Sequence, residues 1–271
     1  MSHRDTDGML AEHVTVERRF QRSIRLDADL GSSDALQGYV LHASASTALT
    51  TTARLLSEGQ GAFTWTGPYG GGKSSLALAL AAALSIGAGP RELARTLLGN
   101  ALQNGFGGPN AQWLPVVVTG RRGDPVSDLR EAVADAVAKA PGKAQTRRSR
   151  KPDPGGRDII ARLVQEATLR TDGGVLVIVD EMGKYLEGAG DCDVDIHFFQ
   201  DLAEAANRSD GRLFIVGILH QAFERYAERL GSTVQDEWAK IQGRFVDVPI
   251  VTAIDEVIDL LGRAVTSTLT H

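Results

Sequence analysis

The sequence predicts an α/β protein with a parallel sheet flanked by helices, and three features of the chain lead to this fold class. Strand-like and helix-like segments alternate along the 271 residues. The strand-like segments are apolar without interruption, which is typical of parallel strands covered by helices on both faces. A glycine-rich stretch separates the first of these strands from the helix after it, so the chain can turn sharply there.

Composition restricts the class of protein further. The formal net charge of −5 gives no overall attraction to nucleic acid or to an anionic membrane, so any such contact requires a local patch. The first twenty residues carry charges throughout, so we predict neither a signal peptide nor a transmembrane helix and expect no membrane partner. The single cysteine, Cys192, fits a reducing compartment. We therefore expect a cytoplasmic protein.

The first part of the chain is expected to contribute two strands and three helices. Apolar periodicity and helix-forming composition place the helices at residues 43–56, 74–84 and 126–140. Strands are predicted at residues 62–66 and 114–120, the second bounded by Pro115 and Gly120.

The second part of the chain begins with an interruption. Residues 141–157 are rich in proline, glycine and arginine and lack apolar periodicity, so we predict a mobile basic loop that interrupts the domain without dividing it. After this loop, helices are expected at residues 158–169 and 196–208, and strands at residues 173–181 and 212–219.

The glycine-rich stretch at residues 67–74 fits the pattern G-x-x-x-x-G-K-[ST]. Glycines allow successive backbone N–H groups to point at a phosphate, and the helix that follows adds the positive end of its dipole. Lys73 is expected to reach the β- and γ-phosphates of a nucleotide, and Ser74 to place its hydroxyl on Mg²⁺. The nucleotide-binding residues predicted from this motif are Gly67, Pro68, Tyr69, Gly70, Gly71, Gly72, Lys73, Ser74 and Ser75.

Two adjacent acids end the apolar strand predicted at residues 173–181. Asp180 is suited to hold Mg²⁺ through water, and Glu181 is suited to polarise an attacking water molecule. Solvated turn residues are the alternative for such a pair. Together with the phosphate loop upstream, the pair favours hydrolysis of ATP, with Mg²⁺ as the second cofactor.

Other classes of phosphate-loop protein were compared. Residues 180–183 satisfy the D-x-x-G pattern of GTPases, but no [NT]-K-x-D motif for guanine follows, so GTP specificity is unsupported. Small-molecule kinases stay open as an alternative, because they usually carry an arginine-rich lid and residues 146–151 are strongly basic.

Downstream features resemble the AAA+ ATPases. His220 follows the strand predicted at residues 212–219, where that class places its first sensor residue, although a core or surface histidine is an equal alternative. Residues 243–245 resemble the "GRF" segment, whose arginine reaches the nucleotide of a neighbouring subunit. Arg244 matches that arginine, and a surface salt-bridge partner is the alternative. The resemblance also makes Tyr39 and Val40 candidates for the adenine pocket, with core packing as the alternative. It implies a homo-oligomer that acts through Arg244 in trans.

Over residues 22–249 the chain is similar to the ATPase module of large bacterial proteins usually called only ATP-binding, some of which are encoded among phage-defence genes. The domains expected from this resemblance are an N-terminal extension at 1–30, an AAA+ core at 31–250, and the start of a truncated helical lid at 251–271. Those bacterial proteins continue well beyond this point, so we expect at most a partial lid.

The function expected from these features is Mg²⁺-dependent binding and hydrolysis of ATP that drives a conformational or assembly change. A nucleotide-gated switch or scaffold with slow turnover is the alternative. The basic residues 147–151 could contact nucleic-acid phosphates, and a solvated loop is the other interpretation of this segment. The effector, the trigger and the size of the oligomer are not encoded in any recognisable motif.

Overall fold

The described strands form a single parallel sheet. The computed structural model describes residues 24–85, 90–102, 105–108, 110–140, 153–170, 172–189, 197–222, 232–253, 255–258 and 261–262. The strands lie in the order β2-β3-β4-β1-β5, and all neighbouring strands are parallel. Their bounds are β1 Ala62–Thr66, β2 Trp113–Thr119, β3 Gly174–Asp180, β4 Leu213–Leu219 and β5 Val246–Pro249. Within the described residues, every helix is too short or too polar to cross a membrane.

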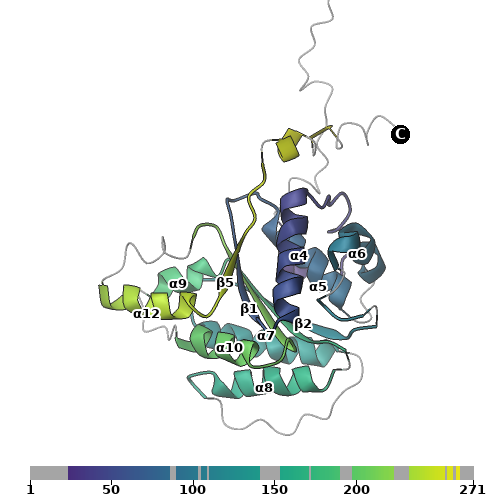
Figure 1. Ribbon diagram of the computed structural model, residues 1–271. Helices are drawn as coiled ribbons and strands as arrows, with labels where there is room; N and C mark the ends of the chain where they lie inside the picture. Colours follow the sequence, from purple (N-terminus) through teal and green to yellow (C-terminus); the bar gives the residue numbers. More distant parts are fainter. Residues whose placement is uncertain are drawn as a thin grey trace, which may run out of the picture.

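One face of the sheet is covered by the helices that precede and follow β1 (Figure 1). These are α3 (Leu26–Asp29), α4 (Ala43–Ser57), α5 (Lys73–Leu84), α6 (Arg91–Leu98) and the short 3₁₀ helix η1 (Gly99–Leu102). Helix α5 is apolar on all sides and ten of its twelve residues are buried, as expected for a helix enclosed by the sheet and other helices. On this face the Trp65 ring of β1 is fully buried, and its Nε1–H donates to Thr52 Oγ1 at 3.2 Å.

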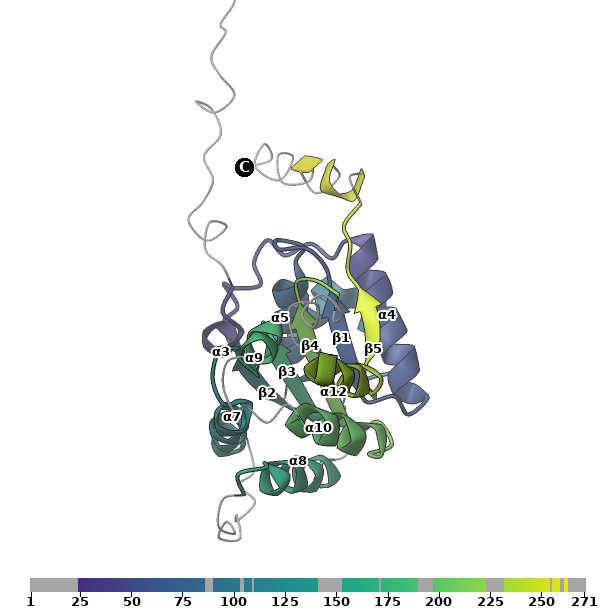
Figure 2. The same ribbon diagram turned by 90° about the vertical axis from the view of Figure 1, so that its left-hand side faces the viewer.

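The other face is covered by the remaining helices, which Figure 2 shows in front of the sheet. They are α7 (Pro125–Lys139), α8 (Arg157–Thr168), α9 (Gly183–Ala189), α10 (His197–Asn207) and α12 (Ser232–Gln242). Strands β3 and β4 are buried along their whole length because helices cover both of their faces. The three layers explain why both strands are apolar without alternation.

The expected α/β architecture is confirmed, with one strand misjudged and several elements missed. Pro115 was predicted to bound the second strand, but β2 continues through it and pairs Pro115 with Leu176. Strand β2 lies at the edge of the sheet, so a residue without an N–H can face the unpaired side. Strand β5 and helices α6 and α12 were not predicted. The packed core also begins earlier than residue 31, because Leu26 is fully buried.

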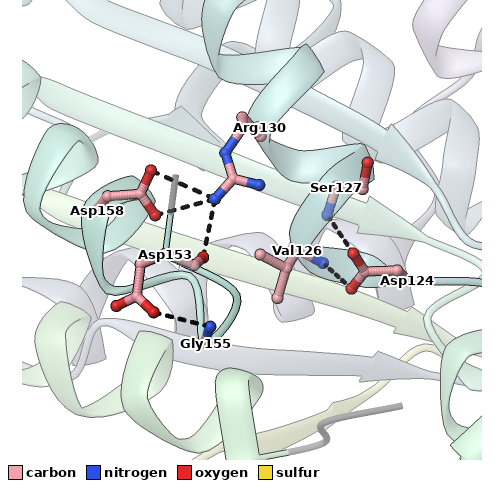
Figure 3. Close-up of polar contacts among 7 residues, drawn as sticks. All are labelled: Asp124, Val126, Ser127, Arg130, Asp153, Gly155 and Asp158. Atoms are coloured by element: carbon pink, nitrogen blue, oxygen red, sulfur yellow. Dashed lines mark hydrogen bonds and ion pairs between the residues drawn. The ribbon is translucent and has the colours of Figure 1, made fainter. Parts of the chain in front are cut away.

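The N-terminal half of α7 is tied to the start of α8 (Figure 3). Arg130 of α7 donates through Nη2 to the Asp153 carbonyl at 3.0 Å and to the Asp158 carboxylate at 3.0 and 3.3 Å. Asp124 caps α7 by accepting the N–H groups of Val126 and Ser127. These contacts join two helices of one face, although residues 141–152, within the predicted basic loop, lie outside the described residues.

The carboxyl ends of three adjacent strands meet at one edge of the sheet. Strand β4 lies between β1 and β3, and the pairing places Thr66 opposite Leu219 and Val179 opposite Gly217. The segments that leave β1, β4 and β3 therefore start side by side. In open α/β sheets this edge is where ligands bind, particularly where strand order reverses as it does around β1.

Gly67 occupies the point where β1 enters this edge. A Cβ added at Gly67 would lie only 2.1 Å from the carbonyl oxygen of Ile250, which follows β5. The Ile250 N–H in turn donates to the Thr66 carbonyl at 2.7 Å. Only glycine fits this close approach of two backbones.

We predict that Gly67→Ala lowers the free energy of unfolding more than Gly70→Ala. Gly70 has φ +77° but nothing lies within 4 Å of an added Cβ, so its substitution costs only the left-handed conformation, about 1–2 kcal/mol. At Gly67 the clash with Ile250 should cost about 1–3 kcal/mol more. Urea unfolding of both variants measures the difference, and equal losses would contradict the tight approach at Gly67.

Candidate functional site

The chain between β1 and α5 forms an open loop that leads directly into a helix N-terminus. Gly72 is the N-cap of α5, has φ +75° and provides no side chain to cap the helix. The first amides of a helix lack intrahelical acceptors, and the helix dipole is positive at this end. The loop therefore presents backbone donors and partial positive charge where an anion would bind.

Lys73 adds a full positive charge inside the loop. Its side chain is buried, and Nζ donates to the carbonyl oxygens of Gly67 and Pro68, both at 2.7 Å. Burial lowers the pKa of Lys73, while the nearby Asp180 carboxylate acts to raise it. The ammonium is thus held across the loop by two neutral acceptors that an anion could replace.

Ser74 and Asp180 bring a hydroxyl and a carboxylate together from opposite sides of β4. Ser74 Oγ donates to Asp180 Oδ1 at 3.1 Å, and Asp180 is 5% exposed. Burial raises the pKa of Asp180, and the hydrogen bond from Ser74 opposes that effect. Hydroxyl and carboxylate oxygens are the ligands that Mg²⁺ prefers, so this pair fits the predicted metal position.

Glu181 has a strained backbone immediately after β3. Its φ is +51°, a left-handed conformation that costs a residue with a Cβ about 1–2 kcal/mol. The Glu181 N–H donates to Asp180 Oδ1 at 3.0 Å, and its carboxylate forms an ion pair with Lys184. Sequence reasoning missed Lys184, although its position three residues after Glu181 is the spacing at which helical side chains meet.

His220 follows β4, between the phosphate loop and the acids. Its ring stacks on Tyr69 with the ring centroids 3.6 Å apart and the planes 19° apart. Burial lowers the pKa of His220 and the Lys73 ammonium lowers it further, so the ring is neutral at pH 7. Tyr69 itself is 76% exposed, so an aromatic side chain stands in solvent above the phosphate loop.

Tyr39 and Val40 lie on the segment that leads to α4. The Tyr39 hydroxyl is buried and forms no hydrogen bond with any described residue. Burial raises the pKa of this hydroxyl. A buried hydroxyl without a partner is costly, and a ligand that bonds to it would remove that cost. Val40 is half-buried. His42, which sequence reasoning did not single out, lies beside Gly72.

Arg244 lies at the opposite edge of the sheet from the phosphate loop. It precedes β5, and its carbonyl accepts hydrogen bonds from Asn207 and from Gln60, which stands before β1. Strand β5 separates Arg244 from the phosphate-loop edge by roughly 13 Å of extended chain. The guanidinium Nε forms an ion pair with Glu204 of α10 at 2.9 Å. Arg244 therefore does not join the site assembled from its own chain.

Of the predicted site residues, the structure brings together the phosphate loop, Asp180, Glu181 and His220, and it separates Arg244 from them. The basic residues 147–151, predicted as a contact for nucleic acid or as a kinase-like lid, lie outside the described residues.

Comparison with known proteins gives a similarity in structure alone. No protein-family model matches the chain, and no curated protein matches its sequence significantly. Among solved structures, the chain is similar to the ORC2 protein of Aeropyrum pernix, which was solved in ADPNP and ADP complexes. The identity is 14%, the TM-score is 0.51, and the match covers 83% of this chain and 52% of ORC2. The two proteins share an α/β fold in which helices flank a parallel sheet. The chain spans about half the length of that protein.

We predict that Asp180→Asn stabilises the protein at neutral and alkaline pH. The folded chain holds a proton on Asp180 more tightly than the unfolded chain does, so the wild type loses stability as the pH rises through the raised pKa. Both hydrogen bonds to this carboxylate end on Oδ1, and an amide oxygen can accept both. Urea unfolding should give a gain for the variant near about pH 8 that shrinks toward about pH 4.

Asp128→Asn provides the control of opposite sign. Burial acts to raise the pKa of Asp128, but hydrogen bonds from Arg121 and Tyr185 hold it below its ordinary value. Asp128→Asn should therefore lower stability at neutral pH. A loss of stability in Asp180→Asn at about pH 8 would show that burial of this charge is not unfavourable.

Proposed function

We propose that this protein binds ATP with Mg²⁺ and hydrolyses it to drive a conformational or assembly change. The observation that carries this proposal is the hydrogen bond between Ser74 and Asp180 beside the buried ammonium of Lys73. It places a hydroxyl, a carboxylate and a cation at the N-terminus of α5, where loop amides can hold phosphates. The ORC2 protein, similar in fold, was solved with ADPNP and ADP, which supports a nucleotide as the ligand.

Each residue has a role that its surroundings permit. The amides of residues 67–75 and the Lys73 ammonium bind the phosphates, and Ser74 with Asp180 holds Mg²⁺, whose charge offsets the charge of the phosphates. Glu181 would orient and polarise the attacking water, and His220, which follows β4, would contact the γ-phosphate. Tyr39 and Val40 line the adenine pocket, supported by the unpartnered Tyr39 hydroxyl.

A nucleotide-gated switch with slow turnover is the second candidate, and one contact favours it. The Glu181 carboxylate is ion-paired with Lys184, so the group proposed to orient the attacking water is already engaged by another side chain. In this alternative the same residues bind ATP, and the presence of bound ATP, rather than its hydrolysis, changes the state of the protein. The rate of steady-state hydrolysis separates the two candidates.

A role in a bacterial defence system and a location in the cytoplasm are further proposals. The first is supported by the sequence resemblance of residues 22–249 to ATP-binding modules, some of which are encoded among phage-defence genes. The second is supported by the single cysteine, which fits a reducing compartment.

We propose that the active assembly is a homo-oligomer in which Arg244 completes the site of a neighbouring subunit. The charge that develops on the γ-phosphoryl group needs a cation that Lys73 and Mg²⁺ supply only in part. Arg244 is 40% exposed and is oriented by Glu204 through Nε, while its position far from its own loop leaves it available to a neighbour. This arrangement supports action across an interface.

We predict that Lys73→Ala abolishes nucleotide binding, whereas Glu181→Gln binds ATP without hydrolysing it. The first variant removes the cation from the phosphate site, and the second keeps the shape of the side chain but removes its ability to polarise water. Calorimetric titration and phosphate release measure the two effects. The controls are Lys139→Ala and Glu187→Gln, which change exposed residues outside the site. Unchanged turnover in Glu181→Gln would remove that residue from the proposed role.

We predict that Arg244→Ala binds ATP normally but turns over roughly 10³-fold more slowly, because an arginine supplied in trans has an effect of that order. A mixture of Arg244→Ala with Lys73→Ala should regain part of the activity, since one chain keeps the nucleotide site and the other keeps the arginine. Arg208→Ala is the control, because Arg208 contacts the same Glu204 at 3.6 Å and is 81% exposed. No recovery in mixtures shown to co-assemble would exclude action in trans.

A further inference from the structure

The side chain of His42 lies between the phosphate loop and the segment that follows β5. His42 is the N-cap of α4, and its Nδ1 accepts the N–H of Ala45 at 3.2 Å. The same Nδ1 lies 2.8 Å from the hydroxyl oxygen of Ser44. Nε2 lies 3.5 Å from the position that a Cβ on Gly72 would occupy, and only 7% of the side chain is exposed. The ring is therefore packed beside the turn that starts α5.

Glu256 reaches the same ring from the end of the described chain. Its Oε1 accepts the Ser44 N–H at 2.9 Å, and its Oε2 accepts the Ser44 hydroxyl at 3.0 Å. Oε2 lies 3.6 Å from His42 Nδ1 and also accepts the Ala253 N–H at 3.3 Å. A carboxylate that follows β5 thus closes the first turn of α4, where N–H groups lack intrahelical acceptors.

Polar contacts hold this segment against the core. The large apolar side chains that the structure describes here are exposed: Val251 by 60%, Val257 by 44% and Ile258 by 62%, followed by Leu261 at 62%. The segment leaves the sheet at Ile250, whose carbonyl lies against Gly67. It therefore meets the phosphate loop directly at Gly67 and through His42 at Gly72. A segment with so few buried apolar groups undocks at low free-energy cost.

We propose that Glu256 and His42 couple the docking of residues 251–258 to occupation of the phosphate loop, so that each event favours the other. The proposal rests on the proposed nucleotide binding and describes how that site is regulated. An anion bound by the loop amides fixes the turn at Gly72 and with it the ring beside it. The same ring orientation places Nδ1 beside the Ser44 hydroxyl, and Ser44 donates to Glu256 through its N–H and its hydroxyl. The segment therefore docks without the cost of ordering the ring again. His42 is a positioning residue here, because it acts through Gly72 and Glu256.

The test measures nucleotide affinity and segment docking separately. A fluorescent ADP analogue is titrated into the full chain, into Glu256→Gln and His42→Asn, and into the double variant. Each single variant should bind at least about fivefold more weakly, within the range of measured couplings. The double variant should bind no more weakly than the weaker single variant, because both changes break one connection. Asp255→Asn, which alters the adjacent exposed carboxylate, should bind like the wild type.

The second measurement is the rate of hydrogen exchange of residues 251–258 with and without ADP. If Glu256 only stabilised the fold, this rate would not depend on ADP. ADP should slow exchange there in the wild type and in Asp255→Asn but not in Glu256→Gln. If the wild type binds ADP while Glu256→Gln keeps the same affinity, or if exchange does not respond to ADP, the coupling is wrong and nucleotide binding stands. If the wild type binds no nucleotide, the proposed function fails and the coupling fails with it.

Discussion

The hydrogen bond from Ser74 to Asp180 joins two segments that are 106 residues apart, and it depends on the parallel pairing of three strands. Strand β4 lies between β1 and β3, so the two residues meet only because all three strands run in the same direction and end at the same edge. Every other feature of the candidate site follows from this arrangement. The phosphate loop extends β1, His220 extends β4, and the acids extend β3.

That edge also collects the features that oppose stability. Lys73 and Asp180 are charged groups in buried positions, and Glu181 adopts a backbone conformation that suits glycine better. Helices α5 and α10 and the uninterrupted apolar strands supply the stability that tolerates these costs. Buried charges and strained backbone that occur together at one place in an otherwise stable fold are typical of functional sites.

Two segments far apart in sequence approach the site from different elements. Residues 39–42 approach the phosphate loop before α4 begins, and residues 250–256 return to it after β5 ends. Both segments lie at the edge where the strands finish, although they are far apart in sequence. Of the two, the segment after β5 has its described large apolar side chains exposed, which permits it to respond to a bound ligand.

The sequence by itself determined the class of fold and the composition of the phosphate loop, because apolar runs, helical periodicity and the G-x-x-x-x-G-K-S spacing are local patterns. It predicted β1 to the residue, since its apolar run is closed by Gly61 and Gly67. It misjudged Pro115, whose tolerance depends on β2 being an edge strand, and it missed β5, which is only four residues long. Tertiary structure alone decided the stacking of Tyr69 on His220 and the meeting of His42 with Glu256. These contacts depend on where separate segments leave the sheet, which no local pattern encodes.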